Sequence, residues 1–292
     1  MIDVRKILEA GQVVLDTEHD AKEVLKRGTL RIGSAGAVIE NGEVHGTCHR
    51  IALSRMLGVD KPVDAPRRIM FAAGNANEDI WYEIVKRGWN GKIFREEEIA
   101  VEWTVPGSDV KVTGRPDMVL ADENGVPVQG IELKGVFSLG TAKSVELDGK
   151  PKDEHLIQAA MYSMLLNIPW TLAYTNASVV DLQFDRKKYG LAKIEPFYRM
   201  FQLTWEDDRL FYLDEHKSEK VRTEITKSSL TDFYSMIVEM RDTKQLGPRP
   251  ASGGMDGSKA YWSKCDAKYC PFSAACDKHE DNYDKWIKAI TE

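Results

Sequence analysis

The sequence has few cysteines and no long apolar segment. Only four of its 292 residues are cysteine, and no run of about eighteen apolar residues occurs, so a membrane-spanning helix is not expected. The N-terminus also lacks the basic and then apolar order of a secretory signal. We therefore expect a cytoplasmic protein, in which four cysteines favour metal ligation or free thiols over disulfides.

An excess of positive charge and an ATP-binding motif are also missing. The formal net charge is -6, which argues against a protein that coats nucleic acid through bulk electrostatics but is compatible with a local basic channel. No phosphate-binding loop of the form G-x-x-x-x-G-K-(S/T) occurs, so we expect an activity without ATP. Short basic clusters, each of which alone is typical of a solvated surface, are Arg67-Arg68, Lys86-Arg87, Lys150 with Lys152, and Arg186-Lys187-Lys188.

Composition and hydrophobic periodicity predict one globular unit of helices and strands. Hydrophobic residues make up 42% of the chain and charged residues 29%, which is the profile of a globular enzyme with a substantial core. A hairpin is expected at Asn41-Gly42. The expected helices cover residues 3–27, 48–57, 67–87, 154–166 and 228–241, and the expected strands cover residues 92–105, 110–121, 126–136, 170–184 and 197–213. In the helix 67–87 the apolar face is predicted from Phe71, Trp81, Ile84 and Val85.

The most informative segment carries two acidic residues and a lysine around a turn. Its sequence contains Gly114-Arg-Pro-Asp117, then Glu123-Asn124-Gly125, then Ile131-Glu132-Leu133-Lys134. If Asn124 and Gly125 are the central residues of a type I′ turn, counting back along both strands places Asp117 opposite Glu132. Lys134, two residues from Glu132, then points to the same face of the sheet.

Two carboxylates and an ammonium group on one face suggest a metal site for phosphodiester hydrolysis. Like charges repel, so two close carboxylates favour a bound cation, and a hard ion such as Mg²⁺ or Mn²⁺ prefers oxygen ligands. Such an ion acidifies water and stabilises charge on a phosphate, while Lys134 would position the attacking water or neutralise the phosphate. The alternative is a surface hairpin with an ordinary ion pair between a carboxylate and Lys134.

Two further helical motifs flank this hairpin. Upstream, Gly74-Asn-Ala-Asn-Glu78 offers a third carboxylate beside a glycine that permits close packing. Downstream, His155, Gln158 and Tyr162 share one face of the helix 154–166, which suggests a wall of an active site. The alternative for this helix is a half-exposed face on which Tyr162 covers the core.

The order of these motifs resembles the RecB-like branch of the PD-(D/E)XK nucleases. Four motifs follow one another between Gly74 and Tyr162: a helix with G-x-x-x-(H/E), then G-x-x-D, then E-x-K, then Q-x-x-x-Y. Many RecB relatives have histidine where this chain has Glu78, and viral recombination exonucleases often have glutamate there.

The resemblance implies a role for each matching residue. Glu78, Asp117 and Glu132 would be metal ligands, and Lys134 would be the catalytic lysine. Gln158 and Tyr162 would contact DNA or support the site. A bound Mg²⁺ or Mn²⁺ is expected with this set.

The cysteines extend the resemblance to nucleases that carry an iron-sulfur cluster. Cys48 opens a helix before the nuclease motifs, and Cys265, Cys270 and Cys276 follow them. This distribution is similar to the CRISPR-associated Cas-four exonucleases, the AddB recombination subunit and the nuclease domain of the Okazaki-fragment helicase, although the first gap in the tail is four residues where those families usually have two. A [4Fe-4S] cluster requires four such thiolates. A structural Zn²⁺ site and unligated core cysteines are the alternatives.

Together these features predict an α/β protein with a PD-(D/E)XK, restriction-endonuclease-like core. We expect one domain over residues 1–292, with a mixed, centrally antiparallel sheet flanked by helices in residues 67–245. Residues 1–66 and 246–292 are expected to form a cysteine-ligated metal-cluster lobe.

The expected activity is metal-dependent DNA hydrolysis, more exonucleolytic on single-stranded or resected ends than sequence-specific. This preference comes from the resemblance. The resemblance also implies a role in recombination, repair or CRISPR adaptation, with proteins of these pathways as partners. If the chain is phage-encoded, it would act in the host cytoplasm. A DNA-end-binding adaptor with little nuclease activity and an RNA-processing metalloenzyme are the alternative functions. No membrane partner is expected, and an oligomer is compatible with the sequence.

Overall fold

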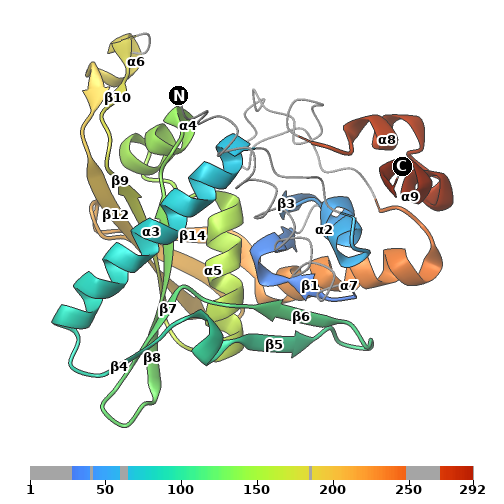
Figure 1. The fold of residues 1–292 in the computed structure, drawn as a ribbon, viewed down its shortest axis with the longest axis horizontal. Coiled ribbons are helices and arrows are strands. Elements are labelled where there is room, and N and C mark those ends of the chain that lie inside the picture. The colour runs from blue at the N-terminus through green and yellow to red at the C-terminus, as the bar shows by residue number, and fades with distance from the viewer. Residues whose placement is uncertain (1–27, 40–41, 60–64, 184–185, 248–269, 292) are drawn as a thin grey trace, which may run out of the picture.

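A computed structural model describes residues 28–39, 42–59, 65–183, 186–247 and 270–291. Two features expected from the sequence lie outside these residues: the helix over residues 3–27, and Cys265. Figure 1 shows a central sheet with helices on both faces. No helix in the described part is long and apolar enough to cross a membrane.

A seven-stranded mixed sheet forms the centre of the fold. Its order is β14-β13-β12-β9-β8-β7-β4, and within it β8 and β9 run parallel while the other neighbours are antiparallel. This confirms the expected mixed sheet, but the parallel pair β8-β9 lies near its centre, where antiparallel strands were expected. The strands are β4 (Lys92–Phe94), β7 (Met118–Ala121), β8 (Pro127–Gly135), β9 (Trp170–Asn176), β12 (Phe197–Glu206), β13 (Arg209–Asp214) and β14 (Glu219–Thr226).

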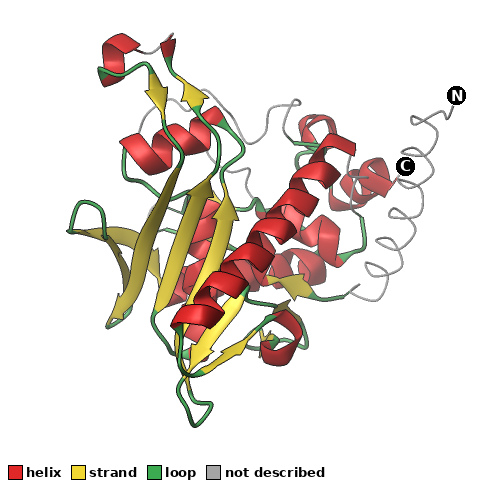
Figure 2. Cartoon of the chain, turned by 60° about the vertical axis from the view of Figure 1, so that its left-hand side comes forward, coloured by secondary structure: helices red, strands yellow, loops and turns green. Residues whose placement is uncertain are grey.

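The two faces of this sheet are covered by different helices, α3 (Ala65–Gly88) and α5 (Asp153–Leu166) (Figures 1 and 2). Met118, Leu133 and Ala173 point to one face, where Trp81 and Val85 of α3 pack against them. Because side chains alternate along a strand, the residues between them point to the opposite face, toward α5. Glu132 and Lys134 are therefore on the α5 side of β8.

Smaller elements close the α5 side and the ends of the sheet. They comprise a three-stranded sheet in the order β1-β6-β5, a hairpin β2-β3, a projecting hairpin β10-β11, and the remaining helices. The bounds are β1 (Leu30–Arg31), η1 (Ile32–Ser34), β2 (Gly36–Val38), β3 (Val44–Gly46), α2 (His49–Met56), η2 (Glu96–Ile99), β5 (Val101–Thr104), β6 (Lys111–Gly114), α4 (Leu139–Ala142), η3 (Lys143–Leu147), β10 (Val180–Asp181), α6 (Arg186–Tyr189), β11 (Lys193–Ile194), α7 (Lys227–Thr243), α8 (Ser273–Lys278) and α9 (Tyr283–Thr291). The β2-β3 pair confirms the hairpin expected around Asn41-Gly42.

Several expected strands are divided in the structure. The segment 92–105 gives β4 and β5 with η2 between them, and the segment 110–121 gives β6 and β7 on either side of Pro116. In both cases the two halves belong to different sheets. β14 was not expected, because its sequence Glu-Lys-Val-Arg-Thr-Glu-Ile-Thr is mostly charged and polar, as suits an edge strand with exposed residues.

The exposed apolar residues of α3 correct the predicted face of that helix. Phe71 is 60% exposed and Ile84 is 54% exposed, whereas Trp81 and Val85 pack on the sheet as expected. Two of the four predicted residues, Trp81 and Val85, therefore lie on the face of the helix that contacts the sheet, and the other two do not.

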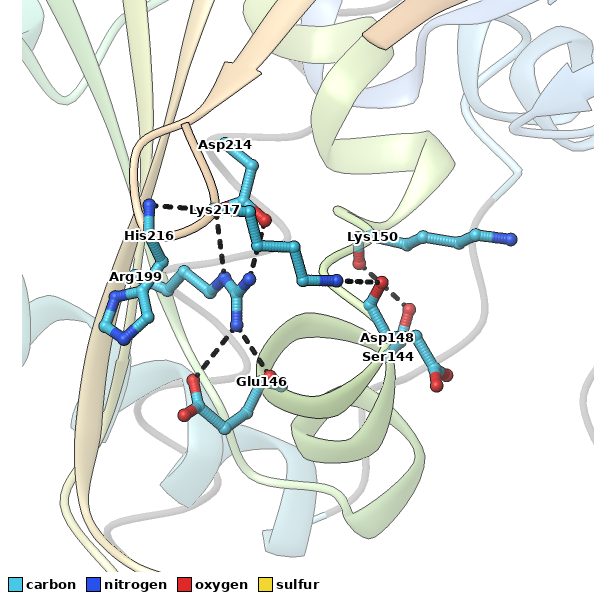
Figure 3. A network of polar contacts seen from close by, with 8 residues as sticks. All are labelled: Ser144, Glu146, Asp148, Lys150, Arg199, Asp214, His216 and Lys217. Carbon is cyan, nitrogen blue, oxygen red and sulfur yellow. Dashed lines mark hydrogen bonds and ion pairs between the residues drawn. The ribbon is translucent and has the colours of Figure 1, made fainter. Parts of the chain in front are cut away.

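A buried ion pair holds the segment that connects β8 to α5 (Figure 3). The Arg199 guanidinium is bidentate on Asp214, with Nη2 to Oδ2 at 2.6 Å and Nε to Oδ1 at 3.3 Å, and these residues are only 3% and 1% exposed. Nη1 of Arg199 also donates to the carbonyl oxygen of Glu146 at 2.6 Å. A charge pair removed from water in this way depends on full hydrogen bonding.

The same segment is fixed at later points along its backbone. Lys217 Nζ donates to the carbonyl oxygen of Asp148 at 3.1 Å, and the Lys150 N–H donates to the carbonyl oxygen of Ser144 at 2.8 Å (Figure 3). Gly149 has φ +69°, and a Cβ there would lie 2.8 Å from Asp214 Oδ2. The chain that leaves Lys134 therefore returns to α5 along a fixed path over the sheet.

Replacing Arg199 by methionine is expected to lower the free energy of unfolding by about 3–5 kcal/mol, because the Asp214 carboxylate stays buried without its partner. Chemical denaturation with a two-state fit would measure the loss. Arg209→Met is the matched control, since the partner carboxylate Glu224 is 59% exposed; this change should cost about 1 kcal/mol or less. Equal losses in the two variants would contradict the importance of the buried pair.

Candidate active site

The hairpin between β7 and β8 brings Asp117 and Glu132 together, but with a different turn from the one expected. Met118 pairs with Ile131 and Leu120 pairs with Gln129, so Asp117 lies opposite Glu132 as predicted. The turn itself closes with the Gly125 N–H donating to the carbonyl oxygen of Asp122.

In this turn Gly125 has a positive φ of +82° and Asn124 has none, so the type I′ prediction was wrong. The pattern is that of a type I turn followed by a left-handed glycine. It places Ala121 opposite Pro127, one residue out of the predicted register. A bulge with Val128 as the extra residue then restores the predicted pairing before the strands reach the carboxylates.

Glu132 is a fully buried carboxylate with one partnered oxygen. Its side chain is 0% exposed, and Oε1 accepts a hydrogen bond from Lys134 Nζ at 2.6 Å. Oε2 is buried without a hydrogen-bond partner. Burial raises the pKa of Glu132 to about 8, the charges of Asp117 and Glu78 raise it as well, and Lys134 opposes them.

Lys134 and Asp117 complete the charged group around Glu132. Burial alone would lower the pKa of Lys134, but the charges of Glu132 and Asp117 outweigh it and raise the pKa. Asp117 Oδ2 accepts the backbone N–H of Leu133 at 2.6 Å, which ties the carboxylate to β8. The ion pair with Lys134 is therefore mostly buried, unlike the exposed pair of the alternative reading.

Glu78 reaches this group from α3. It acts electrostatically on both Glu132 and Lys134, so the three carboxylates share one region. As their side chains stand, no three His, Cys, Asp or Glu residues among those described are grouped closely enough to hold a metal ion.

The helix α3 is fixed beside β9 by Asn77, whose Oδ1 accepts a hydrogen bond from Thr175 Oγ1 at 3.1 Å. Gly74 does not have the packing role that we expected, because a Cβ at this position would meet no atom within 4 Å. The position of Glu78 therefore depends on the hydrogen bond of Asn77 and on the packing of Trp81 against the sheet, and not on Gly74.

Tyr162 and Gln158 support the turn that presents Asp117. Tyr162 is 2% exposed, and its hydroxyl donates to the carbonyl oxygen of Arg115 at 2.9 Å. Burial raises the pKa of Tyr162 well above its ordinary value, while a hydrogen bond from Gln158 opposes this. A Cβ at Gly114 would lie 2.8 Å from the Tyr162 hydroxyl, so the glycine lets this contact form. Of the two roles expected for Tyr162, the geometry favours support over contact with DNA.

His155 contacts a partner that the sequence did not reveal. Its Nδ1 lies 3.0 Å from the Tyr174 hydroxyl, which accepts the backbone N–H of Lys152. The hydroxyl hydrogen is thus left for Nδ1, and we infer that the imidazole proton is on Nε2. Burial lowers the pKa of His155 to about 3, and the charges of Lys134 and Lys152 lower it too. The sequence signal that could have identified Tyr174 is the alternation of side chains along β9, which puts Tyr174 on the same face as Leu172.

The cysteines lie partly in the described residues. Cys270 and Cys276 are buried, Cys48 is half-buried, and none of these three forms a disulfide. Cys276 Sγ accepts the indole N–H of Trp286 at 3.3 Å.

The start of α2 and the C-terminal segments are joined by Arg50. Arg50 Nη2 donates to the carbonyl oxygens of Gly247 at 2.7 Å and Glu280 at 3.3 Å. Two residues after Cys48, the chain is thus tied to the stretches on both sides of the segment that contains Cys265.

Comparison with known proteins gives distant structural similarity. The crystal structure of SSO0001 matches with a TM-score of 0.45 and 16% sequence identity, over 91% of this chain and 96% of that one. An alkaline exonuclease (LHK-Exo) from Laribacter hongkongensis matches with a TM-score of 0.39 and 12% identity, over 76% of this chain and 94% of that one. No protein-family model and no curated protein matches the sequence.

Acidification is expected to destabilise the protein partly through His155. Its pKa of about 3 in the folded state lies below the ordinary value near 6.5, so between these pH values the unfolded chain binds a proton that the folded chain does not. The free energy of unfolding should fall as pH falls through this window, by at most about 1.4 kcal/mol per pH unit.

Denaturation curves at several pH values would compare the wild type with His155→Gln, in which this contribution is absent. His216→Gln is the control because the His216 side chain is exposed. Identical pH slopes for the wild type and His155→Gln would show that His155 is not the buried neutral group described above.

Proposed function

We propose that the protein is a Mg²⁺- or Mn²⁺-dependent nuclease that hydrolyses phosphodiester bonds in DNA. The observation that carries this proposal is the carboxylate of Glu132, which is 0% exposed and has a buried oxygen, Oε2, without a hydrogen-bond partner. A buried acid beside two other acids is unfavourable unless a cation offsets their charge.

The residues present fit a hard divalent cation by the chemistry of their donors. Glu78, Asp117 and Glu132 offer carboxylate oxygens, which Mg²⁺ and Mn²⁺ prefer, and Oε2 of Glu132 has the free lone pairs. We propose that these three residues hold the ion. When bound, the ion would acidify water and stabilise negative charge on the phosphate.

The residues of the chain itself would orient the reactants and carry charge. Lys134, held at 2.6 Å from Glu132 and with a raised pKa, stays protonated and supplies positive charge to the phosphate or orients the attacking water. Asp117 is kept in place by the Leu133 N–H, and Tyr162 and Gln158 stabilise the turn before it. His155 presents an uncharged Nε2–H donor beside Lys134.

The substrate part of the proposal rests on the order of the sequence motifs. We propose exonucleolytic action on single-stranded or resected DNA ends, in recombination, repair or CRISPR adaptation. Partner proteins of such pathways belong to the same proposal. An adaptor that only binds DNA ends would have no use for the buried acids beside Lys134.

We further propose that Cys48, Cys265, Cys270 and Cys276 hold a [4Fe-4S] cluster. Arg50 supports this, because it joins the start of α2 to both stretches that border the Cys265 segment. The bond from the Trp286 indole to Cys276 Sγ is of the kind that stabilises a thiolate. In this lobe the metal would tie the N-terminal part of the chain to its tail.

Digestion of a fluorescent single-stranded oligodeoxynucleotide with Mn²⁺ tests the hydrolase. We expect Asp117→Asn and Lys134→Met to slow cleavage by about 100-fold or more, because each removes charge that acts on the reacting phosphate. Asp109→Asn and Lys111→Met are matched controls at exposed positions and should cleave like the wild type. Cleavage that survives Asp117→Asn would exclude the proposed site, and binding without any cleavage by the wild type would favour the adaptor.

Anaerobic purification tests the cysteine cluster. We expect visible charge-transfer absorbance with about four iron atoms for each chain, both lost in Cys276→Ser, with a lower midpoint of thermal unfolding because the tail is no longer tied down. Cys276→Ala with Ser273→Ala as the control separates thiol ligation from packing, since Ser273 lies in the same short helix and is also buried. Stoichiometric zinc, or neither metal, would contradict the iron-sulfur proposal.

A further inference from the structure

One row of residues crosses the end of the sheet next to the candidate site. Gly135, the last residue of β8, pairs with Thr175 of β9, and Thr175 pairs with Tyr198 of β12. Paired residues point to the same face, and the bond from Thr175 to Asn77 shows that this face is the α3 side. The row is therefore next to Lys134 in sequence, although the Lys134 side chain points to the α5 side. On α3, the bond to Asn77 brings the row beside Glu78.

This row carries two exposed aromatic rings. The Phe137 ring covers Gly135 so closely that a Cβ on Gly135 would lie 2.6 Å from it, yet Phe137 is 51% exposed. Tyr198 is 66% exposed. Two strand spacings of about 4.8 Å separate their positions in the sheet, so the rings are offset by roughly 10 Å. Aromatic rings supply large contact areas at interfaces, and exposed apolar side chains that lie together mark interaction sites.

A basic hairpin projects beyond the same end of the sheet. β10 and β11 continue from the ends of β9 and β12 and carry α6 at their tip, close to α4 (Figures 1 and 2). Arg186, Lys187 and Lys188 of α6 are exposed, and no carboxylate of the described chain is in ion-pair distance of their side chains.

The hairpin tip is anchored to the segment that follows β8. Tyr189 of α6 has two ammonium groups near its ring, Lys188 at 4.6 Å and Lys143 at 5.5 Å from the centroid. Lys143 follows directly on α4, so the hairpin and α4 are in contact at this point. The basic tip is thus held beside the chain that leaves Lys134.

From this arrangement we propose that Phe137, Tyr198 and the cations Arg186, Lys187 and Lys188 form a binding track for single-stranded DNA that leads to the candidate site. This deepens the proposed nuclease function and rests on it for the direction of the strand. Unpaired bases would stack on the two rings, and the cations would neutralise the backbone phosphates.

The chemistry of the track favours an unpaired strand over a duplex. Base stacking on an aromatic side chain requires a base whose face is free, and it tolerates any sequence. In a duplex the base faces are already stacked, so only the cations would act on it. Local positive charge also resolves the conflict between an acidic chain of net charge -6 and a polyanionic substrate.

Fluorescence anisotropy of labelled (dT)₂₀ with the full-length protein, with EDTA present to prevent cleavage, tests the track. Phe137→Ala and Tyr198→Ala should each weaken binding by about tenfold, while Tyr198→Phe should retain it. The triple change of Arg186, Lys187 and Lys188 to Gln should reduce the slope of log affinity against log salt by about 2. Blunt duplex DNA should lose affinity in the triple variant but not in the aromatic variants.

The matched control is the triple change of Lys86, Arg87 and Lys92 to Gln, which removes the same charge at the opposite end of the sheet. An equal loss in this control would overturn the track in favour of bulk charge. Unchanged (dT)₂₀ binding in the track variants, with unchanged circular dichroism, or tighter binding of (rU)₂₀ than of (dT)₂₀, would also overturn it.

The two proposals fail separately. If the wild type digests DNA in an Asp117-dependent way but the track variants bind normally, the hydrolase stands and the track is wrong. If the track variants lose binding but no protein digests DNA, the surface stands and the hydrolase is wrong.

Discussion

The burial of the Glu132 carboxylate is the constraint on which the rest of the site depends. A carboxylate with no exposed surface on a central strand costs free energy unless its charge is offset. Lys134 offsets part of this charge at one oxygen, while Asp117 and Glu78 add to the problem. The arrangement concentrates negative charge where a hard cation would be stabilised most.

The surroundings of Glu132 keep this arrangement rigid. On its side of the sheet, α5 presents Tyr162 to the turn before Asp117, and His155 to Tyr174 on the neighbouring strand. The connection from Lys134 to α5 is in turn held by the Arg199–Asp214 pair. Each support uses a hydrogen bond that is at least partly buried, and such bonds are stronger where water competes less for them.

Sequence reasoning succeeded where a local rule acts on neighbouring residues. The strand alternation placed Glu132 and Lys134 on one face, and turn residues placed Asp117 opposite Glu132. The turn type was wrong, yet the pairing was right, because the bulge at Val128 compensates for the different turn. Turn type depends on the φ of Asn124, which tertiary packing decides as much as sequence does. The helix boundaries of α5 and α7 were also close to the prediction, because α5 is apolar over most of its length and the apolar residues of α7 recur along one face.

Contacts between distant segments could not be predicted in this way. Arg199 and Asp214 are in one hairpin, but their third partner, Glu146, is 53 residues away from Arg199. His155 was recognised as part of a polar helix face, whereas Tyr174 was only a position in the expected strand over residues 170–184. Gly74 was assigned a packing role from its residue type alone, and an open environment contradicts it.

The distribution of charge explains how an acidic chain could still act on a polyanion. The three carboxylates near Glu132 repel phosphate until a cation is bound, so a strand must be attracted from outside the site. The exposed cations of α6 lie on the projecting hairpin β10-β11, where they form no ion pair with a carboxylate of the described residues. In the proposed function attraction and hydrolysis are thus divided between two places, and the chain between Lys134 and Lys143 connects them.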